Sequence, residues 1–228
     1  AEELGYDSLF TWDHVYPIVG SWEGPAFETY TAMAAVAAQT KRATIGHLVT
    51  ANTFRNPALV AKMITTIDHI SNGRAILGIG AAWMEPEHTG FGIEFGDRPG
   101  TRLRWLEQSL KVITGMLAGE RPSSAEGDRY EVSEALNLPA PVQKHIPILI
   151  GGSGPKVTLR LVAEYADMNN IGRVTSDEIV QKEAALIGHC EAVGRDEKTI
   201  ERTAGMGTPF IRDSREEAFT VMADVFAD

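Results

Sequence analysis

The stretch PILIGGSGPKVTLRLVAEYADMNNIG, residues 147–172, joins an apolar segment to a glycine-rich turn and then to an amphipathic segment. Residues 148–150 are apolar without interruption, which is typical of a strand buried on both faces in a parallel sheet. The glycines of the turn 151–154 allow a close approach to the backbone, and Pro155 suits the first position of a helix. A turn of this kind is a common phosphate site, but a tight connection with no ligand fits the stretch equally well.

Strand and helix patterns alternate along the rest of the chain. We predict strands at residues 7–14, 74–83, 147–150, 166–172 and 199–211, and a strand that leads into a loop over 42–54. Helices are predicted at 26–40, 56–71, 101–119 and 176–194, besides the helix after the glycine turn. Residues 84–99 are predicted as a loop, and residues 120–145 as irregular or hairpin-like. The region of about 84–145 is therefore interpreted as an insertion. Alternation of this kind indicates an α/β protein with a parallel sheet, either open or closed into a barrel.

Candidate ligand groups favour the barrel. They follow four predicted strands, and in a TIM-type (β/α)8 barrel all such strand ends meet on one face, whereas an open sheet gathers them near its switch point. Six or seven strands can be counted, the chain begins at a helix end, and it stops on residues 219–228. We therefore expect a single barrel domain over residues 1–228 that is incomplete at both ends, without its first strand and its last βα unit.

Composition narrows the class of protein. The 228 residues are 43% hydrophobic and carry a formal net charge of −10, which argues against nucleic acid or an anionic membrane as the main partner. There is no long apolar run and no signal peptide pattern, so we expect a cytoplasmic protein. The single cysteine, Cys190, cannot form an internal disulfide and is interpreted as helix packing.

Three blocks carry a resemblance to a known family. They are SLFTWDHVYPIVGSWEGP (8–25), IGHLVTANTFRNPALVAKMITTIDHISNGRAILGIGAAWMEPEHTGFG (45–92) and PILIGGSGPKVTLRLVAEYAD (147–167). In this order they resemble the luciferase-like monooxygenase superfamily, and most of all its F420-dependent oxidoreductase branch. The resemblance extends from Ala1 to roughly Ile211. It implies a TIM-type barrel that binds coenzyme F420, or FMN in other branches, and moves a hydride between F420 and a small organic substrate.

The resemblance also implies roles for individual residues. The turn 151–154 would hold the cofactor phosphate, and the peptide bond Leu48-Val49 would be cis and lie against the ring. Thr50 and Asn52 could bond to the ring edge, although capping of their own loop explains them as well. The candidate cofactor-binding residues are Asp13, Leu48, Val49, Thr50, Asn52, Gly80, Trp83, Gly151, Gly152, Ser153 and Gly154.

His14 is the candidate catalytic residue. It follows a strand beside Asp13, and an imidazole titrates near neutral pH, so it could move a proton as hydride is transferred. Related F420 enzymes resemble this chain in placing the histidine of a DH pair beside the deazaflavin. The competing interpretation is that His14 only orients Asp13. His47 is interpreted as structural, Trp83 as flanking the pocket, and Glu85 and Glu87 as loop carboxylates that could simply be solvated.

Alternatives remain open at this stage. FMN-binding members carry an arginine after the fourth strand, where this chain has Ala81 and Ala82, so a two-component FMN monooxygenase is the second hypothesis. A non-catalytic flavin- or deazaflavin-binding protein is the third. Cations that could meet the polyglutamate tail of F420 are Arg98, Arg102, Arg104, Lys156 and Arg160.

No metal site is expected, because Glu85 and His88 are predicted on a loop rather than on one face of a helix. The apolar helix at 32–38 could support a homodimer, or it could be buried within the monomer.

Overall fold

The computed structural model describes residues 1–172, 175–205 and 210–225. Within these residues, parallel strands form one sheet in the order β1-β2-β4-β5-β6-β7, with β3 paired to β4. The strands are β1 (Ser8–Thr11), β2 (Thr44–His47), β3 (Thr50–Ala51), β4 (Ala75–Gly80), β5 (Ile148–Gly151), β6 (Met168–Asn170) and β7 (Glu201–Thr203). The helices are α1 (Thr29–Gln39), α2 (Pro57–Ser71), α3 (Glu85–Phe91), α4 (Pro99–Leu117), α5 (Thr158–Tyr165), α6 (Ser176–Val193) and α7 (Arg215–Val225).

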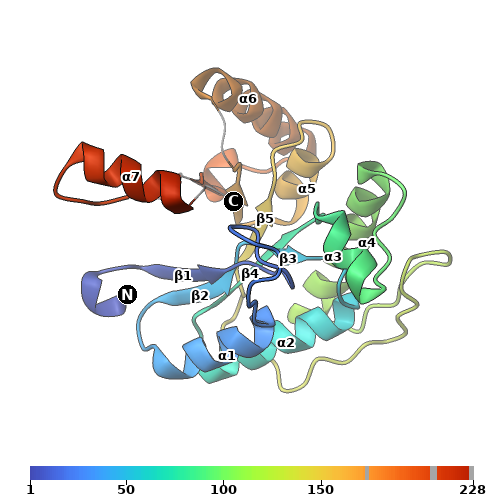
Figure 1. Ribbon diagram of the computed structural model, residues 1–228. Coiled ribbons are helices and arrows are strands. Elements are labelled where there is room, and N and C mark those ends of the chain that lie inside the picture. Colours follow the sequence, from blue (N-terminus) through green and yellow to red (C-terminus); the bar gives the residue numbers. More distant parts are fainter. Residues whose placement is uncertain (173–174, 206–209, 226–228) are drawn as a thin grey trace.

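The sheet is curled into part of a barrel. Helices α1, α2, α4, α5 and α6 follow the outside of the sheet, as Figure 1 shows, and α7 stands apart from it. Strands β1 and β7 are the two edges and are not paired with each other in the described ranges. The predicted α/β architecture of the TIM type is therefore confirmed, in the form of a partial barrel.

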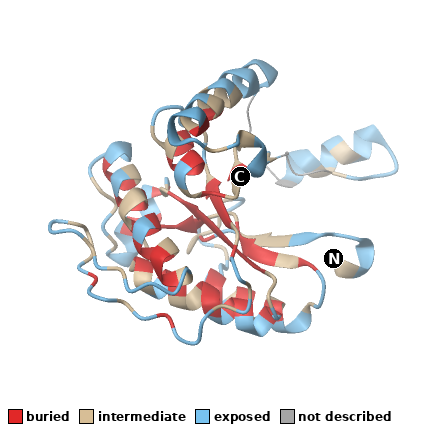
Figure 2. Ribbon diagram, turned by 180° about the vertical axis from the view of Figure 1, so that it is seen from behind, coloured by how far each residue is buried: buried red, intermediate tan, exposed pale blue. Residues whose placement is uncertain are grey.

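The core lies between the sheet and its helices. Every residue of β4 is buried, which agrees with a strand covered on both faces. Figure 2 shows buried residues on the sheet and on the inner sides of the helices, with exposed residues outside. Helix α2 illustrates the local causes: Asn56 caps its start by accepting from Ala58 N–H, Pro57 follows, and Asn72 ends it in the left-handed conformation at φ 56°.

Three predictions of local structure are wrong. Residues 85–91, predicted as loop, form helix α3, with Pro86 in the first turn and Gly92 at the C-cap. Pro155 does not begin a helix, because the chain makes a turn first and α5 starts at Thr158. The stretch 42–54, predicted as one strand that leads into a loop, holds two short strands, β2 and β3, on either side of the peptide bond Leu48-Val49.

The remaining segments agree better with the sequence. Residues 120–145 hold no helix or strand, and Cys190 is a buried, free thiol on α6. Helix α4 lies within the predicted insertion yet packs beside α2 and α5, as a barrel helix does. Of the strand predicted at 199–211, β7 covers 201–203, and residues 206–209 lie outside the described residues. Within the part of the chain described here, no helix combines the length and the apolar character needed to cross a bilayer.

Candidate functional site

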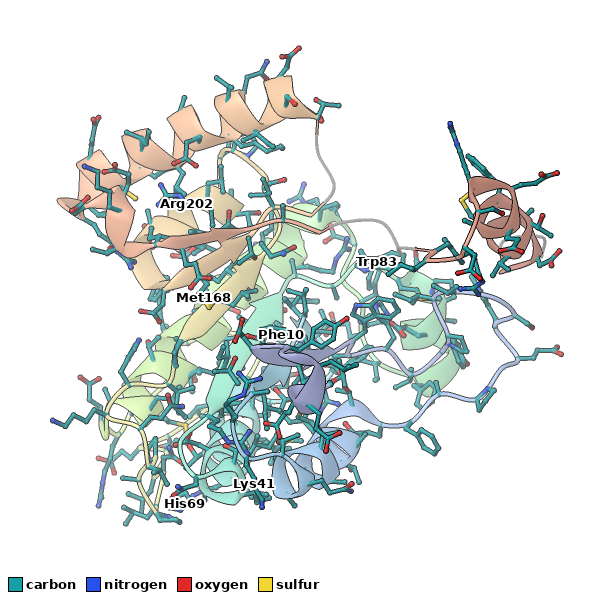
Figure 3. The ribbon with its side chains drawn as sticks, turned by 90° about the vertical axis from the view of Figure 1, so that its left-hand side faces the viewer. Phe10, Lys41, His69, Trp83, Met168 and Arg202 are labelled. Atoms are coloured by element: carbon teal, nitrogen blue, oxygen red, sulfur yellow. The ribbon has the colours of Figure 1, made fainter. Side chains whose placement is uncertain are left out.

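A cavity of about 550 Å³ lies at the carboxyl ends of the strands. Parallel strands bring the residues that follow β1, β4, β5 and β6 to this one edge. In Figure 3, Trp83, which follows β4, lies well away from Lys41 and His69, which precede β2 and β4. The predicted site residues that line the cavity are Asp13, His14, Leu48, Val49, Thr50, Gly80, Trp83, Gly151, Gly152, Ser153 and Gly154.

Asn52 is the exception among the predicted residues. It is 2% exposed and is not part of the cavity wall. Its Nδ2 donates to the backbone oxygen of Arg102 at 3.3 Å, which ties the end of β3 to the first turn of α4. We therefore leave Asn52 out of the proposed site.

Val49 forms a wedge in the cavity wall. The Leu48-Val49 peptide bond is cis, as the sequence resemblance implied. A Cβ placed on Gly80 would come within 2.7 Å of Val49 Cγ2, and one placed on Gly151 would come within 3.0 Å of both Val49 methyl groups. These two strand glycines therefore provide the space that the wedge occupies.

The glycine turn presents fewer free donors than the sequence indicated. Gly151 is part of β5, and the Gly152 N–H donates to Asn170 O at 2.8 Å. Within the described residues, the N–H groups of Ser153 and Gly154 have no backbone acceptor, and both residues line the cavity. Gly152 has a φ of +115°, a conformation that favours glycine. The part of the turn available to an anion is therefore Ser153–Gly154.

His14 is held by a carboxylate that the sequence did not single out as its partner. His14 Nδ1 lies 2.9 Å from Glu87 Oε1, and the backbone N–H of Val15 donates to Glu87 Oε2 at 3.1 Å. Glu87 is 1% exposed, so it is a buried residue of α3 rather than a solvated loop carboxylate. A carboxylate at Nδ1 makes that nitrogen the donor and leaves Nε2 as the ring nitrogen available to a ligand. The ring of Trp83 packs edge-on against His14, with 5.3 Å between centroids.

Asp13 has a structural partner of its own. It accepts two hydrogen bonds from Arg55, at 2.7 and 3.1 Å, and one from the Ala51 N–H at 2.9 Å. Burial raises the pKa of Asp13, and the Arg55 guanidinium and the Ala51 N–H oppose that shift. Arg55 also binds Glu28, the N-cap of α1. Asp13 therefore joins the ends of β1 and β3 to α1 and does not contact the His14 ring through any of these bonds.

A buried polar cluster lies behind the wall. Thr50 Oγ1 and the Tyr30 hydroxyl are 2.8 Å apart, and the Tyr30 ring packs against His47 with 4.2 Å between centroids. His47 Nδ1 lies 2.9 Å from the hydroxyl of Thr11, while its buried Nε2 has no partner in the described residues. Burial, with a smaller contribution from Arg55, lowers the pKa of His47 to about 4. His47 is therefore a neutral core residue at pH 7, as the sequence interpretation held.

Two further residues line the cavity, and only one of them was a candidate from the sequence. Arg102, on α4, was named from the sequence as a cation that could bind the polyglutamate tail of F420, whereas Thr158, at the start of α5, had no signal in the sequence. Glu85 and His88 lie on one helix after all, but no group of three or more His, Cys, Asp or Glu side chains that could hold a metal occurs in the described ranges. The one local signal for α3 is the pair of acidic residues around Pro86, which is a common start of a helix.

Comparison with known proteins places this geometry in a family. The sequence profile described as luciferase-like monooxygenase matches residues 1–227. The chain belongs to this family. An F420-dependent glucose-6-phosphate dehydrogenase of Microbacterium testaceum (strain StLB037) is 36% identical over 168 residues, which are 73% of this chain and 48% of that protein. The match thus spans about half the length of this curated relative.

Solved structures share the fold of this luciferase-like chain. An F420-dependent secondary alcohol dehydrogenase in complex with an F420-acetone adduct superposes with a TM-score of 0.79 at 23% identity, over 89% of this chain and 61% of that one. The monooxygenase RslO1 from Streptomyces bottropensis superposes with a TM-score of 0.77 at 20% identity, over 100% of this chain and 70% of that one. Identities this low establish a common fold and leave the cofactor open.

Proposed function

We propose that this chain carries the cofactor site of an F420-dependent oxidoreductase, which moves a hydride between coenzyme F420 and an organic substrate. The observation that carries the proposal is the His14–Glu87 pair in the same cavity as the Val49 wedge and the free N–H groups of Ser153 and Gly154. The F420-dependent relative at 36% identity supports this choice of cofactor. Ala81 and Ala82 at the end of β4 carry no charge for an FMN phosphate, which disfavours the FMN alternative.

The residues present fit a deazaflavin. The cavity volume is within the range of small-molecule sites, and its wall is largely apolar, with Trp12, Ile18, Trp83 and Leu103 among its members. The two donors of the turn suit a phosphate, and the Val49 wedge offers an apolar support for one face of a flat ring. When bound, F420 would supply hydride transfer at its C5 carbon.

Each side chain has a distinct task in this proposal. Ser153 and Gly154 donate N–H groups to the phosphate, and Thr158 stands beside them with a hydroxyl. His14 holds or releases a proton at Nε2 as charge changes in the substrate, while Glu87 keeps Nδ1 protonated and the ring fixed. Trp83 covers His14 on one side and limits the access of water. Asp13 acts on the cofactor site indirectly: it accepts a hydrogen bond from the Ala51 N–H and so fixes the segment that follows the Val49 wedge.

A titration with paired ligands tests the function. The 228-residue chain is titrated with F420, with FMN and with riboflavin, and the affinity is measured by fluorescence and by calorimetric heat. We expect F420 to bind more tightly than FMN. The Gly154→Ala variant should weaken F420 binding, because its Cβ would lie 3.0 Å from Thr158 Oγ1 and crowd the turn. Gly188→Ala, on the exposed face of α6 with nothing within 4 Å, is the matched control.

The outcomes separate the hypotheses. F420 binding with substrate-dependent reduction of F420 supports the proposal. Tighter FMN binding with oxygen uptake in the presence of a flavin reductase would replace it with a two-component monooxygenase. Binding of F420 without turnover of any organic substrate would reduce the chain to a deazaflavin-binding protein.

A further inference from the structure

Two side chains hold the glycine turn after β5 by its carbonyl groups. Asn169 on β6 donates from Nδ2 to Gly152 O at 3.0 Å. Lys182 on α6 donates from Nζ to Ser153 O at 3.2 Å. Neither Asn169 nor Lys182 is part of the cavity wall, although both of the residues that they hold line it. The two side chains therefore contact the turn from outside the cavity.

The two carbonyls that follow in the turn are occupied as well. Gly154 O accepts from the Leu159 N–H at 3.1 Å, in the first turn of α5. Pro155 O accepts from Nε2 of His189 on α6 at 2.7 Å. Helix α6 packs beside α5, as Figure 1 shows, and so reaches the turn at two points. The carbonyls of residues 152–155 are thus all held by the protein itself.

The held carbonyls set the direction of the free donors. A trans peptide points its C=O and its N–H in opposite directions. In the described residues the cis peptide bonds are Leu48-Val49 and Leu138-Pro139, so both peptides within 152–154 are trans. The N–H groups opposite the two side-chain bonds belong to Ser153 and Gly154, and these are the N–H groups without a backbone acceptor in the described ranges. Holding each carbonyl outside the cavity therefore turns each N–H towards it.

Asn169 is well suited to this task. It is 0% exposed, and its Nδ2 also donates to Ile150 O at 2.9 Å. Two carbonyl acceptors fix the orientation of the amide, because only its nitrogen can donate. The Asn169 Oδ1 is buried and has no partner in the described residues, which costs free energy that an apolar side chain would not. A hydrogen bond to a peptide oxygen also polarises the peptide and strengthens its N–H as a donor.

We propose that Asn169 and Lys182 are positioning residues of the anion site. They hold the carbonyls of Gly152 and Ser153, and so keep the N–H groups of Ser153 and Gly154 aimed at an anion in the cavity. Neither side chain is itself a ligand of the anion. The choice of F420 phosphate as that anion rests on the proposed function, whereas the hydrogen bonds that carry the inference do not.

The first experiment removes the donor of Lys182, which is half-buried, so that the fold should persist. Lys182→Met is compared with Gln181→Met, an exposed neighbour on α6. Affinities are measured for F420 and for its chromophore on the ribityl chain alone, which lacks the phosphate. Lys182→Met should weaken F420 binding about 2- to 10-fold, the range of one hydrogen bond, and leave binding of the chromophore unchanged. Equal losses for both ligands would indicate a merely structural role and overturn the proposal.

Two further measurements separate positioning from direct attraction by the Lys182 charge. Lys182→Arg, which keeps a donor, should restore F420 affinity. The ratio of wild-type to Lys182→Met affinity should persist at high salt, because salt screens an attraction between separated charges but not the orientation of a peptide. A ratio that falls to one at high salt would make Lys182 an electrostatic residue and overturn its positioning role.

Asn169→Leu tests the buried partner. The variant leaves Gly152 O unpaired and frees the Ser153 N–H to turn away, so F420 affinity should fall about 10- to 100-fold, the range of a hydrogen bond to a charged group. Circular dichroism checks that the variant is folded. A folded Asn169→Leu protein with normal F420 affinity would remove Asn169 from the proposal. The Lys182 variants test the inference where Asn169→Leu does not fold.

Inorganic phosphate separates a failure of this inference from a failure of the proposed function. Where the wild type binds neither F420 nor FMN, phosphate should still shift the amide NMR resonances of Ser153 and Gly154. The shifts should be the same in Gln181→Met and smaller in Lys182→Met at equal phosphate concentration. Equal shifts in all three proteins, or none at these amides in the wild type, would overturn the inference.

Discussion

At the scale of single residues, His14 and Glu87 act as one unit. Their bond occupies Nδ1 and leaves Nε2 as the ring nitrogen available to a ligand, and it joins the end of β1 to α3 across 73 positions of sequence. We expect His14→Ala to lower turnover by roughly 10²–10⁴-fold, the usual contribution of a positioned proton donor or acceptor, with little change in F420 affinity. Steady-state rates and binding titrations measure the two effects separately. A variant of normal rate would remove His14 from the mechanism.

Glu87→Gln provides the control for that prediction. A residue that works only through His14 should lower turnover in the wild-type background and have no further effect in the His14→Ala background. Equal effects in both backgrounds would instead indicate a general structural role for Glu87.

The buried His47 predicts a dependence of stability on pH. Burial depresses the pKa of His47 to about 4 in the folded protein, below its ordinary value of 6.5. The unfolded chain therefore binds more protons between these values, so the stability from neutral His47 is complete above about pH 6.5 and declines as pH falls towards about 4. The decline attributable to His47 should approach about 3 kcal/mol.

Urea unfolding between pH 7 and pH 4.5 checks this prediction. The slope for the wild type is compared with that for His47→Gln, which should be less steep. His88, whose pKa burial also lowers, is present in both proteins and cancels in the comparison. Identical slopes would show that His47 is not the group that responds.

At the scale of elements, the junction of β2, β4 and β5 depends on glycine. Gly80→Ala would place a Cβ 2.7 Å from Val49 Cγ2, so the wedge must move. We expect a loss of about 1–3 kcal/mol of stability from this overpacking, together with weaker cofactor binding. Because Val49→Ala removes the clashing methyl group, the double variant should lose less than the sum of the two single variants. Additive losses in denaturant unfolding would contradict the steric explanation.

The same elements show how much of the fold and of the site could be predicted from the sequence. An uninterrupted apolar run located β5, and the alternation of strand and helix patterns located β4. The DH pair and the glycine turn fell on one face because parallel strands bring their ends together. The pairing of His14 with Glu87 and of Asp13 with Arg55 depends on contacts between distant segments, which no local pattern encodes. Helix α3 was missed because glycine, proline and charged residues in a row resemble a loop. The sequence overestimated the number of free N–H donors in the turn, because the Gly152 N–H donates to the backbone oxygen of Asn170 in β6.

At the scale of the whole molecule, an occupied cavity should stabilise the partial barrel. The cavity is lined by residues of β3, β4, β5 and β6 and of helices α3, α4 and α5, so a ligand there contacts most of the sheet. A ligand at 100 times its dissociation constant adds about 2.7 kcal/mol, which for a chain of 228 residues corresponds to a rise of about 5–10 °C in Tm. Differential scanning calorimetry with and without F420 measures this shift. An unchanged Tm at saturating F420 would mean that F420 does not bind the folded chain.

The position of Trp83 has a practical consequence for kinetics. Its indole is 65% exposed, lines the cavity and packs against His14. The emission of an indole changes when an aromatic ring or a charge arrives beside it, so the protein contains its own optical reporter of occupancy. Rapid mixing could then follow association in real time without any attached dye, and the Trp83→Phe protein would separate this signal from those of Trp12, Trp22 and Trp105.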